Sequence, residues 1–380
     1  MRSVMTETAG APERPLKRGW TTGSCATAAA RAAYELLITG TCPAMVEIAL
    51  PSGHRVSFAV AMHEGNESAA TAGIVKDAGD DPDVTHGALI KTSVRVGPDG
   101  SGVVFRAGPG VGTVTKPGLP LPPGEPAINP VPRQMISAAI REAATALNGP
   151  NDVIVEISVP GGEELAKKTL NPRLGIIGGL SILGTTGVVI PFSCAAWIHS
   201  IYRGIDVARA SGLTHIAGAT GTTSEKAVQQ LYQLPDAALI DMGDFVGGML
   251  KYLRRHPVAR ITVAGGFAKM TKLGQGLLDL HSRAGEVDVA WLAEALHDAD
   301  APDALVKLAR GANTALQVLD EAKRLNFPAG DVVARAALST ARRALGDDGI
   351  LLDVVVFDRT GQLVGHSSGA DHSPLPRKRR

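Results

Sequence analysis

The first 150 residues combine helical and strand-like patterns of apolar positions. Residues 25–37 are dense in Ala and Leu and follow a hydroxyl-rich stretch at 21–24, which predicts a helix with a polar N-terminus. Alternating apolar and polar positions at 45–50 and 55–60, separated by a Pro-Ser-Gly turn, predict a hairpin. The same kind of pattern predicts two more strands and a second amphipathic helix, at 88–96, 102–107 and 132–147 respectively.

Two segments of this half lack a regular pattern. Residues 108–132 contain many Gly and Pro, and we expect an irregular binding loop there, because long structureless loops in compact domains are usually functional or disordered. The Asn-Gly-Pro-Asn stretch at 148–151 interrupts the chain after the second helix. We therefore predict a domain boundary at this stretch.

The second half consists of short apolar strands, each followed by a Gly-rich turn and a helical pattern. Strands without polar alternation that are separated by helices indicate a parallel sheet covered on both faces. These strands are predicted at 153–159, 214–217, 237–240, 259–263 and 351–357, with outer helices between 287 and 345.

The predicted fold class is therefore a two-domain protein of α/β and α+β character. An N-terminal mixed-sheet α+β domain precedes a C-terminal Rossmann-like three-layer α/β domain. The predicted limits are a flexible tail at 1–15, the two domains at 16–148 and 149–368, and a basic flexible tail at 369–380. The basic run at the C-terminus is either a solvated tail or a nucleic-acid or targeting patch.

The composition of the chain limits the classes of molecule that it is expected to bind. Hydrophobic residues make up 44 % of the chain, enough for a core in each domain, and no apolar run is long enough for a membrane-spanning helix. The formal net charge of +1 provides no field for binding nucleic acid or an anionic membrane. The 3 cysteines are widely separated, which fits a reduced compartment. We expect a soluble cytoplasmic protein without nucleic-acid or membrane partners, and the sequence leaves a homodimer open.

The strongest local signal for a ligand is a pair of glycine-rich turns after two predicted strands. Gly218 and Gly221 precede Thr222 in the first turn, and Gly265 and Gly266 form the second. About twenty residues after the first turn a strand ends at Asp241, where an acidic side chain binds ribose hydroxyls in Rossmann-like folds. This pattern suits a bound nucleoside, but glycines at such turns also serve close packing.

Several hydrolytic chemistries have no support in the sequence. There is no Walker A pattern, no G-x-S-x-G elbow, no H-E-x-x-H pair and no clustered Cys and His that would form a protein-built metal site. The stretch 160–187 is instead rich in Gly, Thr and basic residues. Such a segment lets the backbone approach a ligand and offers donors to carboxylates.

Several sequence blocks resemble the CbiD family. They are GWTTGSCA at 19–26, VTKPGL at 114–119, GEPAINPVPR at 124–133, VPGGE at 159–163, KTLNPRLG at 168–175 and ILGTTG at 182–187. The resemblance implies an enzyme that methylates carbon 1 of cobalt-precorrin-5B to give cobalt-precorrin-6A, with S-adenosyl-L-methionine as cofactor, in anaerobic-type cobalamin biosynthesis. The cobalt would arrive inside the small-molecule corrinoid substrate.

This implied reaction suggests roles for residues in the matching blocks. A corrinoid carries several carboxylates, so hydroxyls and cations are expected to bind it: Thr21, Thr22, Ser24, Lys116, Arg133, Lys168 and Arg173. Methyl transfer needs aligned reactants more than a nucleophilic side chain. A base that removes a proton from the alkylated ring would be His281 or Glu163. A nicotinamide-dependent reductase and a non-catalytic corrinoid carrier are the alternatives.

Overall fold

The computed structural model describes residues 15–346 and 349–369, which form a mixed α/β protein as predicted. The predicted tails lie outside these residues, except for residues 15 and 369. The chain divides into two compact units. Unit 1 contains residues 15–115 and 120–193, and unit 2 contains residues 116–119 and 194–369 of the described chain.

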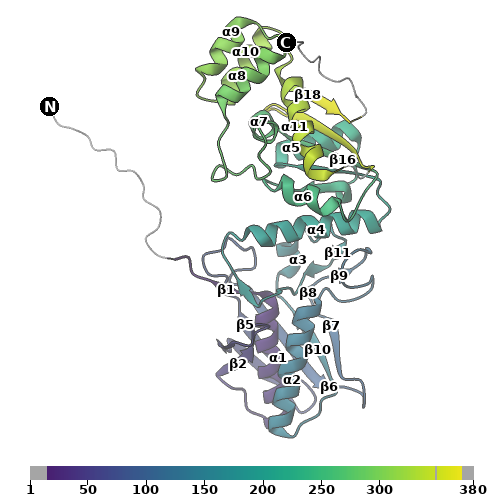
Figure 1. Cartoon of the computed structure of the whole chain (residues 1–380). Helices are drawn as coiled ribbons and strands as arrows, with labels where there is room; N and C mark the ends of the chain where they lie inside the picture. Colours follow the sequence, from purple (N-terminus) through teal and green to yellow (C-terminus); the bar gives the residue numbers. More distant parts are fainter. Residues whose placement is uncertain (1–14, 347–348, 370–380) are drawn as a thin grey trace, which may run out of the picture. The chain divides into compact units, whose positions relative to one another are not determined.

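Unit 1 is built on a five-stranded sheet with the order β4-β5-β6-β10-β7. All neighbours in this sheet are antiparallel except β10 and β7, which are parallel. Helices α1 and α2 pack on each other, and α1 lies along the sheet (Figure 1). The bounds are α1 Thr22–Thr39, α2 Pro130–Leu147, β4 Met62–Gly65, β5 Ala70–Val75, β6 Leu89–Val96, β7 Val103–Ala107 and β10 Val153–Ser158.

Smaller strand pairs complete unit 1. The predicted hairpin is confirmed, because β2 and β3 pair in antiparallel register. Three further pairs join segments that are distant in sequence: β1 with β13, β9 with β11, and β8 with β12. The bounds are β1 Gly19–Trp20, β2 Met45–Ala49, β3 Arg55–Ala59, β8 Gly110–Val111, β9 Thr113–Val114, α3 Gly162–Ala166, β11 Ile176–Ile177, β12 Gly179–Leu180 and β13 Val188–Val189.

Unit 2 contains a second five-stranded sheet with the order β15-β14-β16-β17-β18. The first four strands are parallel, and β18 is antiparallel to β17. The sheet is surrounded by helices, of which α8, α9 and α10 pack together (Figure 1). The bounds are α4 Cys194–Ala210, β14 His215–Ala219, α5 Thr222–Tyr232, η1 Asp236–Ala238, β15 Leu239–Asp241, α6 Val246–Leu253, β16 Arg260–Gly266, α7 Phe267–Gly274, α8 Val289–Asp298, α9 Asp303–Arg310, α10 Ala315–Arg324, α11 Ala329–Leu345, β17 Leu351–Phe357 and β18 Leu363–Ser368.

The division between the units differs from the predicted boundary at 148–149. The strand predicted at 153–159 exists as β10, but its placement in the C-terminal sheet was wrong, because it pairs with β6 and β7 of unit 1. The turn at 148–151 ends α2 with Asn148 in the left-handed conformation and leads into β10 of the unit 1 sheet. Residues 116–119 leave unit 1 because they pack on α4: a Cβ at Gly118 would lie 2.5 Å from the Asp206 carbonyl oxygen.

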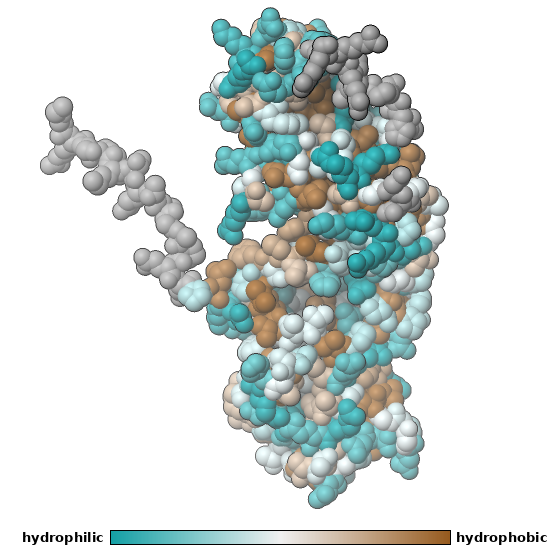
Figure 2. Space-filling view, in the orientation of Figure 1, coloured by the Kyte–Doolittle hydropathy of each residue, from teal (hydrophilic) through white to brown (hydrophobic). Residues whose placement is uncertain are grey.

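Within the described residues, no helix has the length and apolar character required to cross a lipid bilayer. Hydrophobic residues on the face shown in Figure 2 lie singly or in small groups among hydrophilic ones. Scattered exposed apolar residues are normal on protein surfaces. An exposed apolar side chain in this protein therefore suggests a ligand only where its local surroundings support one.

Candidate active site

The carboxyl ends of three neighbouring strands in unit 2 bring the predicted nucleoside-binding residues together. Asp241 ends β15 in register with Ala219 of β14, and Ala219 is in turn aligned with Ala264 of β16. The Thr220 N–H donates to the Ala264 carbonyl at 3.0 Å and joins the two glycine-rich turns. One edge of the sheet therefore contains all six residues predicted to bind the cofactor: Gly218, Gly221, Thr222, Asp241, Gly265 and Gly266.

This edge is also a topological switch point. The chain leaves β14 through α5 to reach β15 on one side, and it leaves β16 through α7–α11 to reach β17 on the other. Ligands of open α/β sheets bind at the carboxyl ends of strands whose connections diverge in this way. Helices α5 and α7 both begin at the divergence, so their unpaired N–H groups add partial positive charge there.

The four glycines at this edge fall into two classes. A Cβ at Gly218 would lie 2.3 Å from Met249 Sδ, and one at Gly265 would lie 2.5 Å from Met270 Cε, so core packing explains both. Gly221 and Gly266 have nothing within 4 Å of such a Cβ. Their φ angles of 164° and −70° are open to any residue. Internal packing therefore does not require glycine at 221 or 266.

A loop that contains His281 is attached to the same edge. The Leu280 N–H donates to the Asp244 carbonyl, and the Leu280 carbonyl accepts from the ammonium groups of Lys269 at 3.0 Å and Lys272 at 3.2 Å. Lys269 also pairs with the Asp244 carboxylate at 2.5 Å. The Lys269 ammonium is thus part of the loop attachment, which sequence reasoning did not foresee.

His281 itself is exposed, and its Nδ1 accepts the backbone N–H of Arg283 at 3.1 Å. In the neutral ring this contact leaves the proton on Nε2, which then acts as a hydrogen-bond donor. To accept a proton at Nδ1 the ring must first release the Arg283 amide. Glu163, the other predicted base, lies exposed in the first turn of α3 in unit 1.

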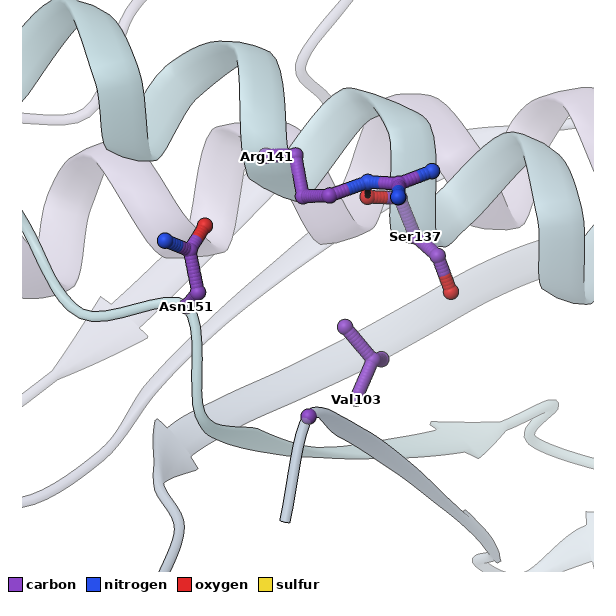
Figure 3. A pocket seen from close by; sticks show the side chains of 5 residues that line it. Val103, Ser137, Arg141 and Asn151 are labelled. Carbon is purple, nitrogen blue, oxygen red and sulfur yellow. Dashed lines mark hydrogen bonds between the residues drawn. The ribbon is translucent and has the colours of Figure 1, made fainter. Parts of the chain in front are cut away.

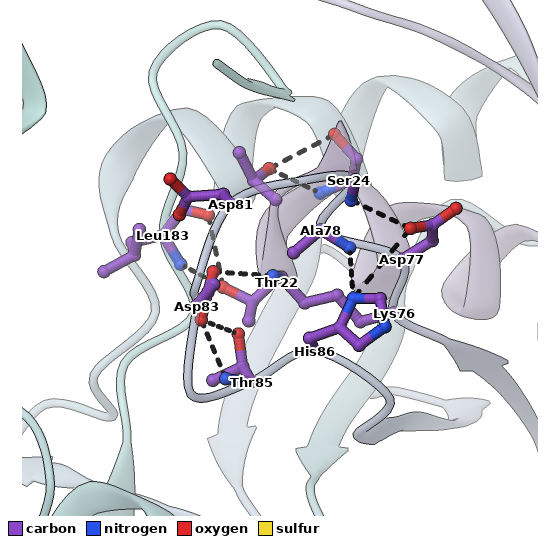
Figure 4. Close-up of polar contacts among 12 residues, drawn as sticks. Thr22, Ser24, Lys76, Asp77, Ala78, Asp81, Asp83, Thr85, His86 and Leu183 are labelled. Carbon is purple, nitrogen blue, oxygen red and sulfur yellow. Dashed lines mark hydrogen bonds and ion pairs between the residues drawn. The ribbon is translucent and has the colours of Figure 1, made fainter. Parts of the chain in front are cut away.

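The hydroxyls predicted to bind substrate at the N-terminus of α1 are buried and bind the chain itself (Figure 4). Thr21 Oγ1 accepts the Ser24 N–H at 3.2 Å as an N-cap. Thr22 Oγ1 accepts the Leu183 N–H at 2.9 Å and donates to the Leu183 carbonyl at 3.2 Å, while Ser24 Oγ donates to the Gly187 carbonyl at 2.7 Å. These groups hold the loop 183–187 on α1, and direct contact with substrate stays a prediction.

We expect Thr22→Val to destabilise the protein by about 1–3 kcal/mol, because it leaves the amide and carbonyl of Leu183 without their side-chain partner. Chemical denaturation measures the loss. Thr39→Val on the same helix is the control, since the Thr39 hydroxyl is exposed and its loss should have little effect. A Thr22→Val protein of normal stability with a raised KM for substrate would contradict the structural role.

A loop beside the N-terminus of α1 contains charged residues that the sequence prediction missed. Lys76 follows β5 on the face that also buries Ala72 and Ile74, and its side chain is only 1 % exposed. Its ammonium donates to Asp83 Oδ2 at 2.7 Å (Figure 4). Burial raises the pKa of Asp83, but the bonds from Lys76 and Thr85 outweigh burial and hold this pKa below its ordinary value.

The same loop positions a residue with an unusual backbone conformation. Asp81 Oδ1 accepts the N–H of Phe192 at 2.9 Å, and Phe192 has a φ of 55°. A bulky residue in the left-handed region is uncommon and needs support from its surroundings. A sequence signal existed for this loop, namely four aspartates between residues 77 and 83 next to a lysine at an apolar position of a strand.

The predicted substrate cations lie in different surroundings. Arg133 is partly buried, and its guanidinium donates to Glu125 Oε2 at 2.8 Å and to the Ile128 carbonyl at 2.8 Å, which holds the loop 125–128 against α2. Lys168 is exposed in unit 1 and Arg173 is partly buried there. Lys116 is partly buried and belongs to unit 2. Arg133 therefore has an evident structural role, and substrate contacts of all four stay predictions.

A pocket of about 270 Å³ in unit 1 contains none of the predicted site residues (Figure 3). It is lined by Gly102, Val103, Ser137, Arg141 and Asn151. Arg141 Nε donates to the backbone carbonyl of Ser137 at 3.3 Å. Among the residues described by the structure, no three His, Cys, Asp or Glu side chains form a group that would hold a metal ion.

Comparisons with known proteins agree with one another. The CbiD family model matches residues 10–191, and the model of the CbiD C-terminal domain matches residues 279–368. A cobalt-precorrin-5B C(1)-methyltransferase of Bradyrhizobium sp. (strain BTAi1) is 79 % identical over 376 residues, covering 99 % of this chain and 100 % of that protein. The protein of the same name from Agrobacterium fabrum is 60 % identical over 365 residues, covering 96 % of each chain. The crystal structure of a cobalamin biosynthesis protein (cbiD) from Archaeoglobus fulgidus is 30 % identical, covers 68 % of this chain and 79 % of that one, and has a TM-score of 0.39.

Proposed function

This chain belongs to the CbiD family, and from that premise we propose that it methylates carbon 1 of cobalt-precorrin-5B with S-adenosyl-L-methionine. The near full-length match to relatives named for that reaction carries the proposal. The corrinoid is then a small-molecule substrate that brings its own cobalt. A methyltransferase needs a site for a methyl donor, and the carboxyl edge of the sheet in unit 2 has features that suit one.

We place the adenosyl cofactor at this edge and describe unit 2 as Rossmann-like. The four parallel strands, the switch point between β14 and β16 and the acidic residue that ends β15 support this description. The open sides of Gly221 and Gly266 leave room for a ligand against the backbone. The Asp241 carboxylate suits the ribose hydroxyls, and the N-terminus of α5 at Thr222 suits the carboxylate of an amino acid.

The cofactor supplies an electrophilic methyl group on a sulfonium. The residues of the chain have to orient it, because near-attack alignment provides much of the rate in such a transfer and no nucleophilic side chain is required. We assign Lys116, Lys168 and Arg173 to the carboxylates of the corrinoid. We assign His281 rather than Glu163 to the proton, because the His281 loop is bonded to the carboxyl edge through Leu280.

Incubation of the purified protein with methyl-labelled S-adenosyl-L-methionine and cobalt-precorrin-5B tests the function. The expected result is one labelled methyl group on carbon 1 of the corrinoid, identified by mass spectrometry and NMR. A nicotinamide-dependent reductase would instead consume NADH or NADPH absorbance without methyl transfer. A corrinoid carrier would bind the substrate without turnover, and either result would overturn the proposal.

We expect Asp241→Ala to weaken the binding of S-adenosylhomocysteine by about 10- to 100-fold, because a hydrogen bond to a charged group contributes about 1.5–3 kcal/mol. Isothermal titration calorimetry measures the change. Asp303→Ala, at the exposed start of α9 in the same unit, is the matched control and should bind normally. Equal affinities for the two variants would remove Asp241 from the site.

A further inference from the structure

Trp197 of α4 lies next to the carboxyl edge of the unit 2 sheet, where we place the cofactor. Its side chain follows the spacing of Ile201 and Ile205, the buried residues on the inner face of α4. Those two residues are 1 % and 0 % exposed, whereas Trp197 is 45 % exposed. Trp197 thus lies on the core-facing side of α4 but is itself not covered by the core.

Two contacts hold the indole in place. Trp197 Nε1 donates to the backbone carbonyl of Asp241 at 3.1 Å. The ring also lies against the backbone of Gly243, where a Cβ would come within 3.2–3.3 Å of the indole atoms. Gly243 has a φ of 51°, so the chain turns closely around the ring. These two contacts therefore hold the indole beside Asp241, the residue assigned to the ribose.

Helix α4 is itself firmly attached within unit 2. The ring of Tyr202 on α4 stacks on Tyr252 of α6, with centroids 4.0 Å apart and an angle of 10° between the planes. The Tyr252 hydroxyl donates to Asp206 Oδ1 on α4 at 2.7 Å. An aromatic side chain on such a helix can offer a ring face without a large loss of conformational entropy when a ligand binds.

We propose that Trp197 forms the wall on which the purine base of the cofactor stacks. This inference rests on the proposed function. In the order β15-β14-β16, Asp241 lies at the end of the outermost strand, and the glycine turns lie on its inner side. A nucleoside with its ribose at Asp241 and its amino-acid part at these turns has its base on the outer side. The indole lies next to Asp241 through its bond to the Asp241 carbonyl, and every purine presents a flat π-face to it.

The test uses S-adenosylhomocysteine as the probe, with tryptophan fluorescence and calorimetry as readouts. The chain has 3 tryptophans, so the wild type is compared with Trp197→Phe and with Trp291→Phe, the matched control in α8. We expect saturating probe to quench the wild type and Trp291→Phe but not Trp197→Phe. Adenosine should reproduce the quenching, and methionine should not.

Calorimetry then measures the contribution of the ring. Trp197→Leu should lose about tenfold in affinity, the scale of base–aromatic stacking, while Trp197→Phe should lose less. Normal affinity in Trp197→Leu, together with quenching that survives in Trp197→Phe, would overturn the stacking role and leave the proposed function intact. Failure of the wild type to bind the probe at all would overturn both.

Discussion

Asp83→Asn should destabilise unit 1 by about 3 kcal/mol, since removing one charge of a buried ion pair leaves the other charge buried without a partner of opposite sign. The Lys76 ammonium is the charge that remains: the Lys76 side chain is 1 % exposed, and that of Asp83 is 25 % exposed. For a unit of this size the loss corresponds to a fall of about 6–12 °C in the Tm of unit 1. Differential scanning calorimetry of the full chain measures it.

A neighbouring pair offers the matched control. Glu64 of β4 and Lys91 of β6 form an ion pair at 3.3 Å on the five-stranded sheet of unit 1, but Glu64 is 64 % exposed. Glu64→Gln should change stability by less than about 1 kcal/mol, as is usual for surface pairs. The double variant Lys76→Met/Asp83→Leu should recover most of the loss, because apolar residues of similar size often replace a buried pair without penalty. Equal Tm values for Asp83→Asn and Glu64→Gln would refute the assignment.

The same pair predicts a pH dependence. The pKa of Asp83 is lowered in the folded protein, so the charged carboxylate stabilises the fold above the unfolded-state value of about 4. This contribution disappears as the pH falls through the lower folded value. The stability difference between the wild type and Asp83→Asn should therefore be full at neutral pH and shrink below about pH 4.

Local signals predicted much of the fold. The helix at 25–37 and the hairpin at 45–60 depend on neighbours within a few residues, and both are confirmed as α1, β2 and β3. The strand at 153–159 was also recognised, but its partner β7 lies about 50 residues earlier and its partner β6 about 60 residues earlier, and nothing in its own sequence identifies them. Apolar strands fit either sheet, and long-range pairing decides between them.

In the candidate site, too, residues with a local sequence signal were predicted, and residues that depend on long-range contacts were missed. The alignment of Asp241 with the two glycine turns follows from a regular strand–turn–helix pattern, and the structure brings these residues to one edge. Lys76 was missed because a lysine normally indicates an exposed position, and its burial depends on Asp83 seven residues later. Trp197 was missed because its importance comes from a contact with Asp241, 44 residues away.

Gly221→Ala and Gly266→Ala should separate the stability of the fold from the binding of the cofactor. Neither added methyl group meets an atom of the chain within 4 Å, and both backbone conformations suit alanine. The folded protein should therefore keep its stability or gain about 0.4–1 kcal/mol, because alanine restricts the unfolded chain. Thermal unfolding of each variant measures this part.

The same methyl groups would lie where the cofactor approaches the backbone. Overpacking costs about 1–3 kcal/mol per site, so each variant should bind S-adenosylhomocysteine about tenfold more weakly and the double variant about a hundredfold. Gly311→Ala is the matched control, because a Cβ at Gly311 would meet only the Leu308 carbonyl oxygen, at 3.9 Å, and Gly311 has a φ of −106° but lies after α9. Gly218→Ala, in contrast, should lower the stability of the fold, because its added methyl group would meet the buried side chain of Met249. A stable double variant with unchanged affinity would mean that the cofactor binds elsewhere, because two methyl groups cannot enter an occupied contact without displacing the ligand.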